Sequence, residues 1–400
     1  MKLAKLSLAA IVVAGLASSS FAADTLADAF KNGKVSGELR AYYFDRDTDV
    51  PKSDTTWDRK KGDSNIINMG VILNYVTDSF YGFKVGGTFQ SNYAPFADDE
   101  AKALFYNDMY GSGAVLSEMY LQYTVGKTTA KVGRQFISTP LISGSGSRMI
   151  KQSFEGALIS NTDLPNTTLA AGYVGKWQNR TSPDTANKKS DVGEFDKFND
   201  DGAYTLLAIN KSIPGLTITG QWEQAVDVVD IYYVELAYAG KMNDFSYGLA
   251  GQYIVTDEED STDKGNLYGI KASLGIGAFK MYAAYAEVDD DAQAKVDFIG
   301  GADPIYTANV IHSGEYSAGS KGYAIDANYE VVKGAKVGAR YSDINMKAAN
   351  SDYDVLDLYA NYAFEGSLKG FGLEVQYETK DKDATTGSSN ELRFRANYKF

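Results

Sequence analysis

The chain has 400 residues, no cysteine and an acidic balance, with 52 Asp+Glu against 39 Lys+Arg. Without cysteine it has no disulfides and no thiolate metal ligands. Its acidity argues against a nucleic-acid partner, because phosphate backbones attract cationic surfaces. Glycine (39) and tyrosine (29) are abundant and proline is scarce (7), as expected for many strands joined by tight turns.

The first residues predict an export signal. Two lysines flank the start of an apolar run from Leu6 to Leu16, and small residues follow at Ser20 and Ala22. We expect cleavage after Ala22, which separates a signal peptide, residues 1–22, from one mature domain, residues 23–400. No later segment approaches the roughly 20 apolar residues that a membrane-spanning helix needs.

The mature chain begins with a segment that favours one or two helical turns. In residues 24–30, Leu26 and Phe30 would share a helix face. We interpret this segment as a short tether before the first strand, which the pattern predicts from Val35 to Asp45.

From there to the C-terminus, apolar and polar residues alternate in about eighteen segments. The last ten residues are the clearest case: one face carries Leu392, Phe394, Ala396, Tyr398 and Phe400, and the other carries Glu391, Arg393, Arg395, Asn397 and Lys399. A soluble edge strand could show this pattern once. Its recurrence along the chain favours a transmembrane antiparallel β-barrel, which satisfies every backbone group within lipid.

The connections between these segments alternate in length. Tight turns rich in Gly, Asn, Asp and Pro separate the strands on one side. Longer polar loops separate them on the other side, at residues 47–64, 94–113, 137–153, 179–201 and 289–321. Short periplasmic turns, long extracellular loops and aromatic residues at both rims are typical of the outer membrane. An even strand number would place both termini on the periplasmic side.

Several motifs resemble a known family. They are residues 25–38 at the mature N-terminus, Val132-Gly133-Arg134-Gln135-Phe136, Thr139-Pro140-Leu141, Ser147-Arg148, Phe154-Glu155-Gly156, Ala171-Gly172-Tyr173, Trp177, Arg180 and Ser182-Pro183. The chain resembles the OprD-type family of outer-membrane channels, and within it the major outer-membrane porins of epsilonproteobacteria. The resemblance implies eighteen strands, a trimer, a third loop (residues 137–153) folded into the lumen, and passive diffusion of small solutes.

Charged side chains in this third loop and on the inner wall are the candidate pore residues. The loop offers Arg148 and Lys151, and Glu118 or Asp326 on the wall would oppose them and create a transverse field. Strand alternation places further cations on the wall at Arg40, Lys84, Arg340, Arg393 and Arg395. Arg134 shares the face of Val132, so it would need a bulge or a strand end to reach the lumen.

We therefore predict a porin that passes ions and small hydrophilic solutes. One alternative is a substrate-selective carboxylate or amino-acid channel, and another is a plugged structural or adhesive barrel. An enzyme is not expected: the only histidine, His312, lies beside Ser313 and Glu315 in a loop whose Gly, Ser and Ala content does not suggest an oriented catalytic histidine, and residues 143–148 lack the lysine and helix of a phosphate loop.

No cofactor is expected. The acidic runs at residues 257–263 and 289–291 offer oxygen ligands that suit calcium, but they lack calcium-loop spacing, so solvated loops are the alternative reading. The expected partners are outer-membrane lipid and lipopolysaccharide, further copies of the chain in a homotrimer, and the barrel-assembly machinery, which would contact the C-terminal strand ending at Phe400.

Overall fold

The structure is a computed structural model that describes residues 23–49, 62–106, 108–184, 189–347, 351–383 and 387–400. The predicted signal peptide, residues 1–22, lies outside the described residues.

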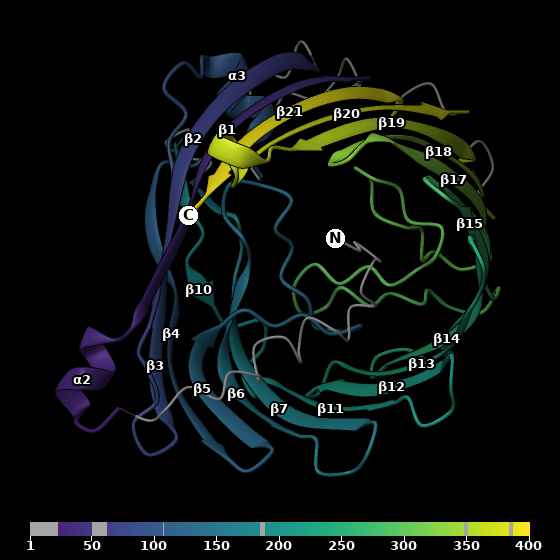
Figure 1. Cartoon of the computed structure of the whole chain (residues 1–400). Helices are drawn as coiled ribbons and strands as arrows, with labels where there is room; N and C mark the ends of the chain where they lie inside the picture. The colour runs from purple at the N-terminus through teal and green to yellow at the C-terminus, as the bar shows by residue number, and fades with distance from the viewer. Residues whose placement is uncertain (1–22, 50–61, 107, 185–188, 348–350, 384–386) are drawn as a thin grey trace.

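Eighteen antiparallel strands form a closed barrel (Figure 1). The ring closes because the first strand, β1, pairs with the last, β21, from Glu38↔Lys399 to Thr48↔Ser389. The predicted barrel and its strand number are confirmed. The barrel strands are β1 (Lys34–Thr48), β2 (Asp63–Val76), β3 (Phe83–Asn92), β4 (Gly113–Val125), β5 (Thr128–Gln135), β6 (Ser153–Asn161), β7 (Thr167–Gln178), β11 (Ala203–Asn210), β12 (Leu216–Ala225), β13 (Val229–Met242), β14 (Phe245–Glu258), β15 (Gly265–Ile276), β16 (Phe279–Val288), β17 (Lys321–Val332), β18 (Ala335–Asn345), β19 (Tyr353–Ala363), β20 (Phe371–Lys382) and β21 (Ser389–Lys399).

The smaller elements lie at the ends of the barrel wall. In the described part of the chain, the helical segments are α2 (Leu26–Lys31), α3 (Asp99–Phe105) and the single turn η1 (Gly366–Leu368). The strands β8 (Thr181–Asp184) and β9 (Lys189–Val192) form a separate hairpin, and β10 (Phe195–Asp196) extends the pairing of β7. Within the described chain, no helix is long and apolar enough to cross a membrane.

Side chains alternate between the outer and inner faces as the sequence pattern requires. On β21, Phe394 is 39% exposed on the outer face, whereas its neighbour Arg393 is 1% exposed inside. The period of two turns each strand into an apolar outer surface and a polar lining.

The strand connections differ at the two ends. Turns such as Gly126–Lys127 close one end, and Gly126 has a φ of +57°, which glycine adopts without a steric penalty. The other end carries most of the longer connections, including residues 136–152 between β5 and β6 and residues 289–320 between β16 and β17. In outer-membrane barrels the long loops are extracellular.

Two of these long connections fold inward and pack on each other. The third loop comprises residues 136–152 in the structure, one residue earlier at each end than predicted, and we call residues 289–320 the second inward loop. Leu141 and Ile142 of the third loop join Ile299 and Ile305 of the second inward loop in one buried apolar cluster, together with Ile231 on the wall. Figure 1 shows both segments inside the ring of strands. The barrel therefore has an apolar core of its own within the lumen.

Candidate pore constriction and lumen

Side chains of the barrel wall hold the third loop by hydrogen bonds to its backbone. The Arg40 guanidinium on β1 donates from Nη1 to the carbonyls of Arg148 (3.1 Å) and Met149 (3.0 Å). The amide of Gln90 on β3 bonds both backbone groups of Lys151, donating at 2.8 Å and accepting at 2.9 Å. Inward-facing polar residues thus satisfy loop groups that would otherwise be buried without partners.

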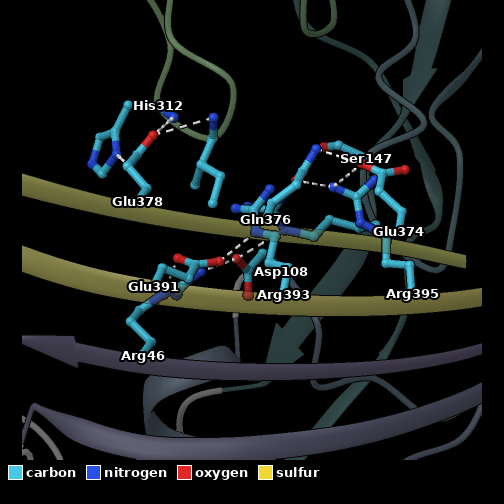
Figure 2. Close-up of polar contacts among 12 residues, drawn as sticks. Arg46, Asp108, Ser147, His312, Glu374, Gln376, Glu378, Glu391, Arg393 and Arg395 are labelled. Carbon is cyan, nitrogen blue, oxygen red and sulfur yellow. Dashed lines mark hydrogen bonds and ion pairs between the residues drawn. The ribbon is translucent and has the colours of Figure 1, made fainter. Parts of the chain in front are cut away.

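Beside this loop lies a group of six arginines that we call the arginine cluster: Arg40, Arg46, Arg148, Arg180, Arg393 and Arg395. Its centre is Asp108 from the connection between β3 and β4, which pairs with Arg46 (2.8 Å) and Arg148 (3.2 Å). Glu391 on β21 continues the chain of ion pairs by contacting Arg46 (2.7 Å) and Arg393 (2.6 Å), as Figure 2 shows.

Positive charge exceeds negative charge in the arginine cluster. Among the residues that the structure describes, four carboxylates contact the six arginines, namely Glu38, Asp108, Glu374 and Glu391. Six minus four leaves two unmatched positive charges. Within the described residues, no carboxylate pairs with Arg180; its Nη2 donates to the Ser145 hydroxyl at 2.8 Å, and its buried Nε has no partner.

The charges of the arginine cluster shift the pKa values of two loop residues, Asp108 and Arg180. Burial alone would raise the pKa of Asp108, but Arg46 and Arg148 hold it well below its ordinary value. Burial and the nearby charge of Arg148 lower the pKa of Arg180 to about 10, so Arg180 remains protonated at neutral pH. Both groups are therefore charged under physiological conditions.

Wall carboxylates, rather than arginines, hold the second inward loop by accepting hydrogen bonds from its backbone N–H groups. Asp357 on β19 accepts a hydrogen bond from the backbone N–H of Val310 at 3.0 Å. Glu378, its neighbour on β20, accepts from the backbone N–H of Ile311 (3.2 Å) and His312 (3.0 Å) and also contacts Nδ1 of His312 (Figure 2). We call this pair of carboxylates and the three loop residues the carboxylate clasp.

Arg340 and Asp326, both predicted wall residues, pair with each other. Arg340 Nε lies 3.1 Å from Asp326 on the neighbouring strand, and its Nη1 donates to the Ala308 carbonyl at 2.7 Å. The Tyr359 hydroxyl also donates to Asp326, at 3.0 Å. Asp326 is thus neutralised by Arg340 rather than opposed to Arg148.

A cavity of 1190 Å³ lies inside the barrel against β12–β21. It extends from the two inward loops, represented by Pro140 and Tyr306, to residues of the short turns such as Gly277 and Gly334. Five acidic and five basic residues line it: Glu235, Asp303, Asp326, Glu330 and Glu374, with Lys271, Lys280, Lys336, Arg340 and Arg395. Equal numbers of acidic and basic groups along this lining suit water and small hydrophilic solutes.

Asp303 is the carboxylate that the second inward loop adds to this cavity. Its side chain remains accessible to lumen water, accepts from the Tyr316 hydroxyl at 2.7 Å and accepts from the Gly314 N–H at 3.0 Å. Partial desolvation by the enclosing protein outweighs these bonds and raises the pKa of Asp303 to about 6.

Two further predicted residues, Glu118 and Lys151, lie at the third loop. Glu118 faces the lumen, accepts a hydrogen bond from the N–H of Phe136 at the base of the third loop (3.1 Å) and pairs with Lys131 Nζ on β5 (3.4 Å). Lys151 lies 4.2 Å from the Phe136 ring, and burial lowers its pKa.

Arg134 lies on the outer face of the barrel. It pairs in register with Met119, which is 54% exposed on that face, and its Nε contacts Glu155 at 3.1 Å. Strict alternation holds through β5 up to this residue, so no bulge turns Arg134 inward. The prediction of Arg134 as a lumen residue is wrong.

Several residues of the site were missed by sequence reasoning. Arg46 and Glu391 lie on inner faces that alternation could have identified. Asp108, Asp303 and the backbone groups of the carboxylate clasp lie in loops, whose positions depend on contacts between distant segments. Within the described chain, no three His, Cys, Asp or Glu side chains group closely enough to hold a metal ion.

Comparisons with known proteins agree with this architecture. The model of the OprD family of outer membrane porins matches residues 92–400, so the chain belongs to that family. Its fold is similar to Pseudomonas aeruginosa OccK9 (OpdG), with a TM-score of 0.79, 18% identity, and coverage of 93% of this chain and 99% of that one. It is also similar to Acinetobacter baumannii OccAB4, with a TM-score of 0.78, 17% identity, and coverage of 92% and 98%.

A third similar structure is P. aeruginosa OpdK with vanillate, with a TM-score of 0.76, 14% identity, and coverage of 93% and 99%. No curated protein matches the chain significantly. Because the chain belongs to the OprD family, it is an outer-membrane transport channel, a class of protein that is not enzymatic. The narrower likeness to epsilonproteobacterial porins stays a prediction.

Proposed function

We propose that this outer-membrane porin passes small hydrophilic solutes with a preference for anions that carry a carboxylate. The observation that carries the proposal is the excess of two positive charges in the arginine cluster, beside the third loop. Charge held in a narrow, low-dielectric passage acts more strongly on a passing ion than the solvated acidic loops do, because salt screens those within about 8–10 Å.

The geometry of arginine supports a carboxylate as the preferred anion. A guanidinium offers a planar pair of donors that matches a carboxylate, and Arg180 has a buried Nε without a partner. Arg340 and Arg395 line the cavity inside the barrel and add further guanidinium groups along the wall, each beside a carboxylate. The OpdK structure contains vanillate, an aromatic carboxylate, within the same fold.

Liposome swelling tests the proposal with solutes of matched size. We expect vanillate to enter reconstituted liposomes faster than its amide or an aromatic cation of similar volume. Arg180→Gln should reduce this difference without slowing a neutral sugar, because the substitution removes charge and keeps most of the side-chain volume. Equal rates for the carboxylate and the amide would contradict the carboxylate preference.

We also propose that the porin assembles as a homotrimer, that the barrel-assembly machinery inserts it through the strand ending at Phe400, and that Arg148, Lys151 and the wall arginines set the constriction. Native mass spectrometry would measure the subunit number. Calcium binding by residues 257–263 or 289–291 remains a hypothesis, and calorimetry without heat at millimolar calcium would remove it.

A further inference from the structure

Three charged residues meet on the outer face of the barrel, near the ends of their strands that bear the long loops. Arg134 Nε on β5 and Lys176 Nζ on β7 contact the same Glu155 carboxylate on β6, at 3.1 Å and 3.5 Å. Their side chains are 36%, 39% and 34% exposed, respectively. Two cations against one carboxylate leave one net positive charge on a surface that faces lipid headgroups. We call these three residues the outer triad.

A β-bulge places Lys176 in the outer triad. Glu155 pairs with Lys176 while the next residue, Gly156, pairs with Val174, so Gly175 is an extra residue in β7. Regular alternation would turn Lys176 toward the lumen, because Tyr173, three residues earlier, faces outward. A bulge that re-aims a charged side chain is a recurring device at functional surfaces.

Directly beside the triad, the outer wall contains an apolar groove of 410 Å³. Three small residues on adjacent strands line it, Ala130, Ala157 and Ala171. Larger side chains flank them: Leu121 and Tyr123 on β4, and the tilted pair Tyr173 and Tyr204, whose ring centroids are 5.2 Å apart. The volume falls in the range of about 300–1,000 Å³ that is usual for small-molecule sites.

The groove and the outer triad form one continuous feature. Val132 lines the groove, and Arg134 is the next outward residue on the same strand, about 7 Å farther along. Ala157 and Glu155 have the same relation on β6. An occupant of the groove would therefore place its head at the charged triad and its apolar part between the tyrosines.

We propose that this surface is a binding site for one phosphate-bearing acylated lipid of the outer leaflet, of the lipid A type found in lipopolysaccharide. The phosphate would contact Arg134 and Lys176, and an acyl chain would occupy the groove. Arginine forms paired, charge-assisted hydrogen bonds with phosphate, and cations at a membrane surface attract anionic lipids. This site goes beyond transport through the lumen and does not depend on the proposed solute preference.

Charge favours a lipid over a second copy of the chain as the occupant. The net positive triad requires an anionic partner at headgroup height, which a phosphorylated lipid supplies with its acyl chain already attached. The Phe195 ring also lies 4.3 Å from the Arg134 guanidinium, which holds that side chain at the rim. A protein partner would have to bring both an acidic group and a matching apolar ridge.

Native mass spectrometry of the folded full-length porin in detergent, titrated with lipid A, tests the proposal. We expect the double variant Arg134→Gln/Lys176→Gln to bind lipid A about 25-fold more weakly, because each cation near an anionic lipid is worth roughly a factor of five. Ala157→Phe should also weaken binding, since it fills the groove and leaves the charges intact. Lys264→Gln, which removes an exposed cation elsewhere on the barrel, should bind like the wild type.

Three outcomes would overturn the proposal. The first is equal lipid A affinity for the double variant and the wild type. The second is a dephosphorylated lipid A that binds as tightly as lipid A, or inorganic phosphate that alone binds as tightly as lipid A. Either result removes the requirement for a phosphate joined to an acyl chain. The third is a change of subunit number in Ala157→Phe with unaltered lipid binding, which would make the groove an interface between copies. Retained single-channel conductance shows that each variant has folded.

Discussion

The arginine cluster and the carboxylate clasp perform the same structural task with opposite charges. At the arginine cluster, Arg40 donates hydrogen bonds to backbone carbonyls of the third loop. At the carboxylate clasp, Asp357 and Glu378 accept hydrogen bonds from backbone N–H groups of the second inward loop. Each charged wall residue thus replaces the water that an inward loop would lose, because buried backbone groups need partners.

The two regions differ in the charge that remains. In the carboxylate clasp, two acids contact backbone N–H groups and His312, and among the described residues no Lys or Arg pairs with either acid. In the arginine cluster, two positive charges are left after pairing, and Arg180 has only hydroxyl contact among the described residues. Anchoring carbonyls requires cations on the wall and anchoring N–H groups requires anions, so the lumen is positive beside the third loop and negative beside the second inward loop.

The largest expected effect follows from removing the centre of the carboxylate clasp. Glu378→Ala leaves the N–H groups of Ile311 and His312 without their acceptor, at a cost of about 2–3 kcal/mol of local stability. We expect faster hydrogen exchange across residues 305–315 and a larger, noisier single-channel conductance. Glu365→Gln, which breaks an exposed ion pair with Lys333 at a short turn, should leave exchange unchanged. Unaltered exchange in Glu378→Ala would show that the clasp does not hold the loop.

Arg40 tests the other anchor with a smaller expected effect. Arg40→Ala should loosen the third loop by about 1.5–3 kcal/mol, because two charge-assisted bonds to carbonyls are lost. Arg40→Lys keeps the charge but lacks the planar fork, so we expect partial loss of anchoring with little change in ion preference. Limited proteolysis within residues 137–152 measures the loosening. Equal protection in Arg40→Ala and the wild type would exclude this anchor.

The smallest expected effect concerns the pH response of the lumen. With its pKa raised to about 6, Asp303 loses its negative charge as the pH falls from 7 to 5. Anion preference in reversal-potential measurements should therefore increase over this interval. A carboxylate whose pKa is raised by folding also stabilises the folded state at low pH and loses that contribution as pH rises from about 4 to 6.

Asp303→Asn removes this titration while keeping the size of the side chain. We expect its ion preference to change less between pH 7 and pH 5 than that of the wild type. A variant whose pH response matches the wild type would assign the effect to another group.

Alternation alone predicted the barrel. The period of two in segments such as residues 391–400 gives each strand one apolar face for lipid and one polar face for the lumen. The same rule placed Arg40, Arg393 and Arg395 on the inner wall. It also gave the correct face for Arg134, whose assignment to the lumen required a bulge that β5 does not contain. A bulge occurs in the neighbouring wall instead, in β7 at Gly175, where a glycine within a strand is a general signal for a bulge but does not fix its position.

Loop positions could not be read from the sequence. Asp108 and Arg148 are 40 residues apart and meet only because two connections fold toward each other. The second inward loop packs on the third loop through Ile299 and Ile305, apolar residues that a solvated extracellular loop would not require. Their burial depends on tertiary contacts, which periodicity does not encode.

The reversal potential in a planar bilayer under a salt gradient is the most direct test of the charge surplus in the arginine cluster. We compare the wild type with Arg148→Gln/Arg180→Gln, and use Lys264→Gln as the control for removing a cation outside the lumen. We predict anion preference in the wild type and in the control, and a shift toward cations in the double variant. An unchanged reversal potential in the double variant, with folded and conducting protein, would contradict the account.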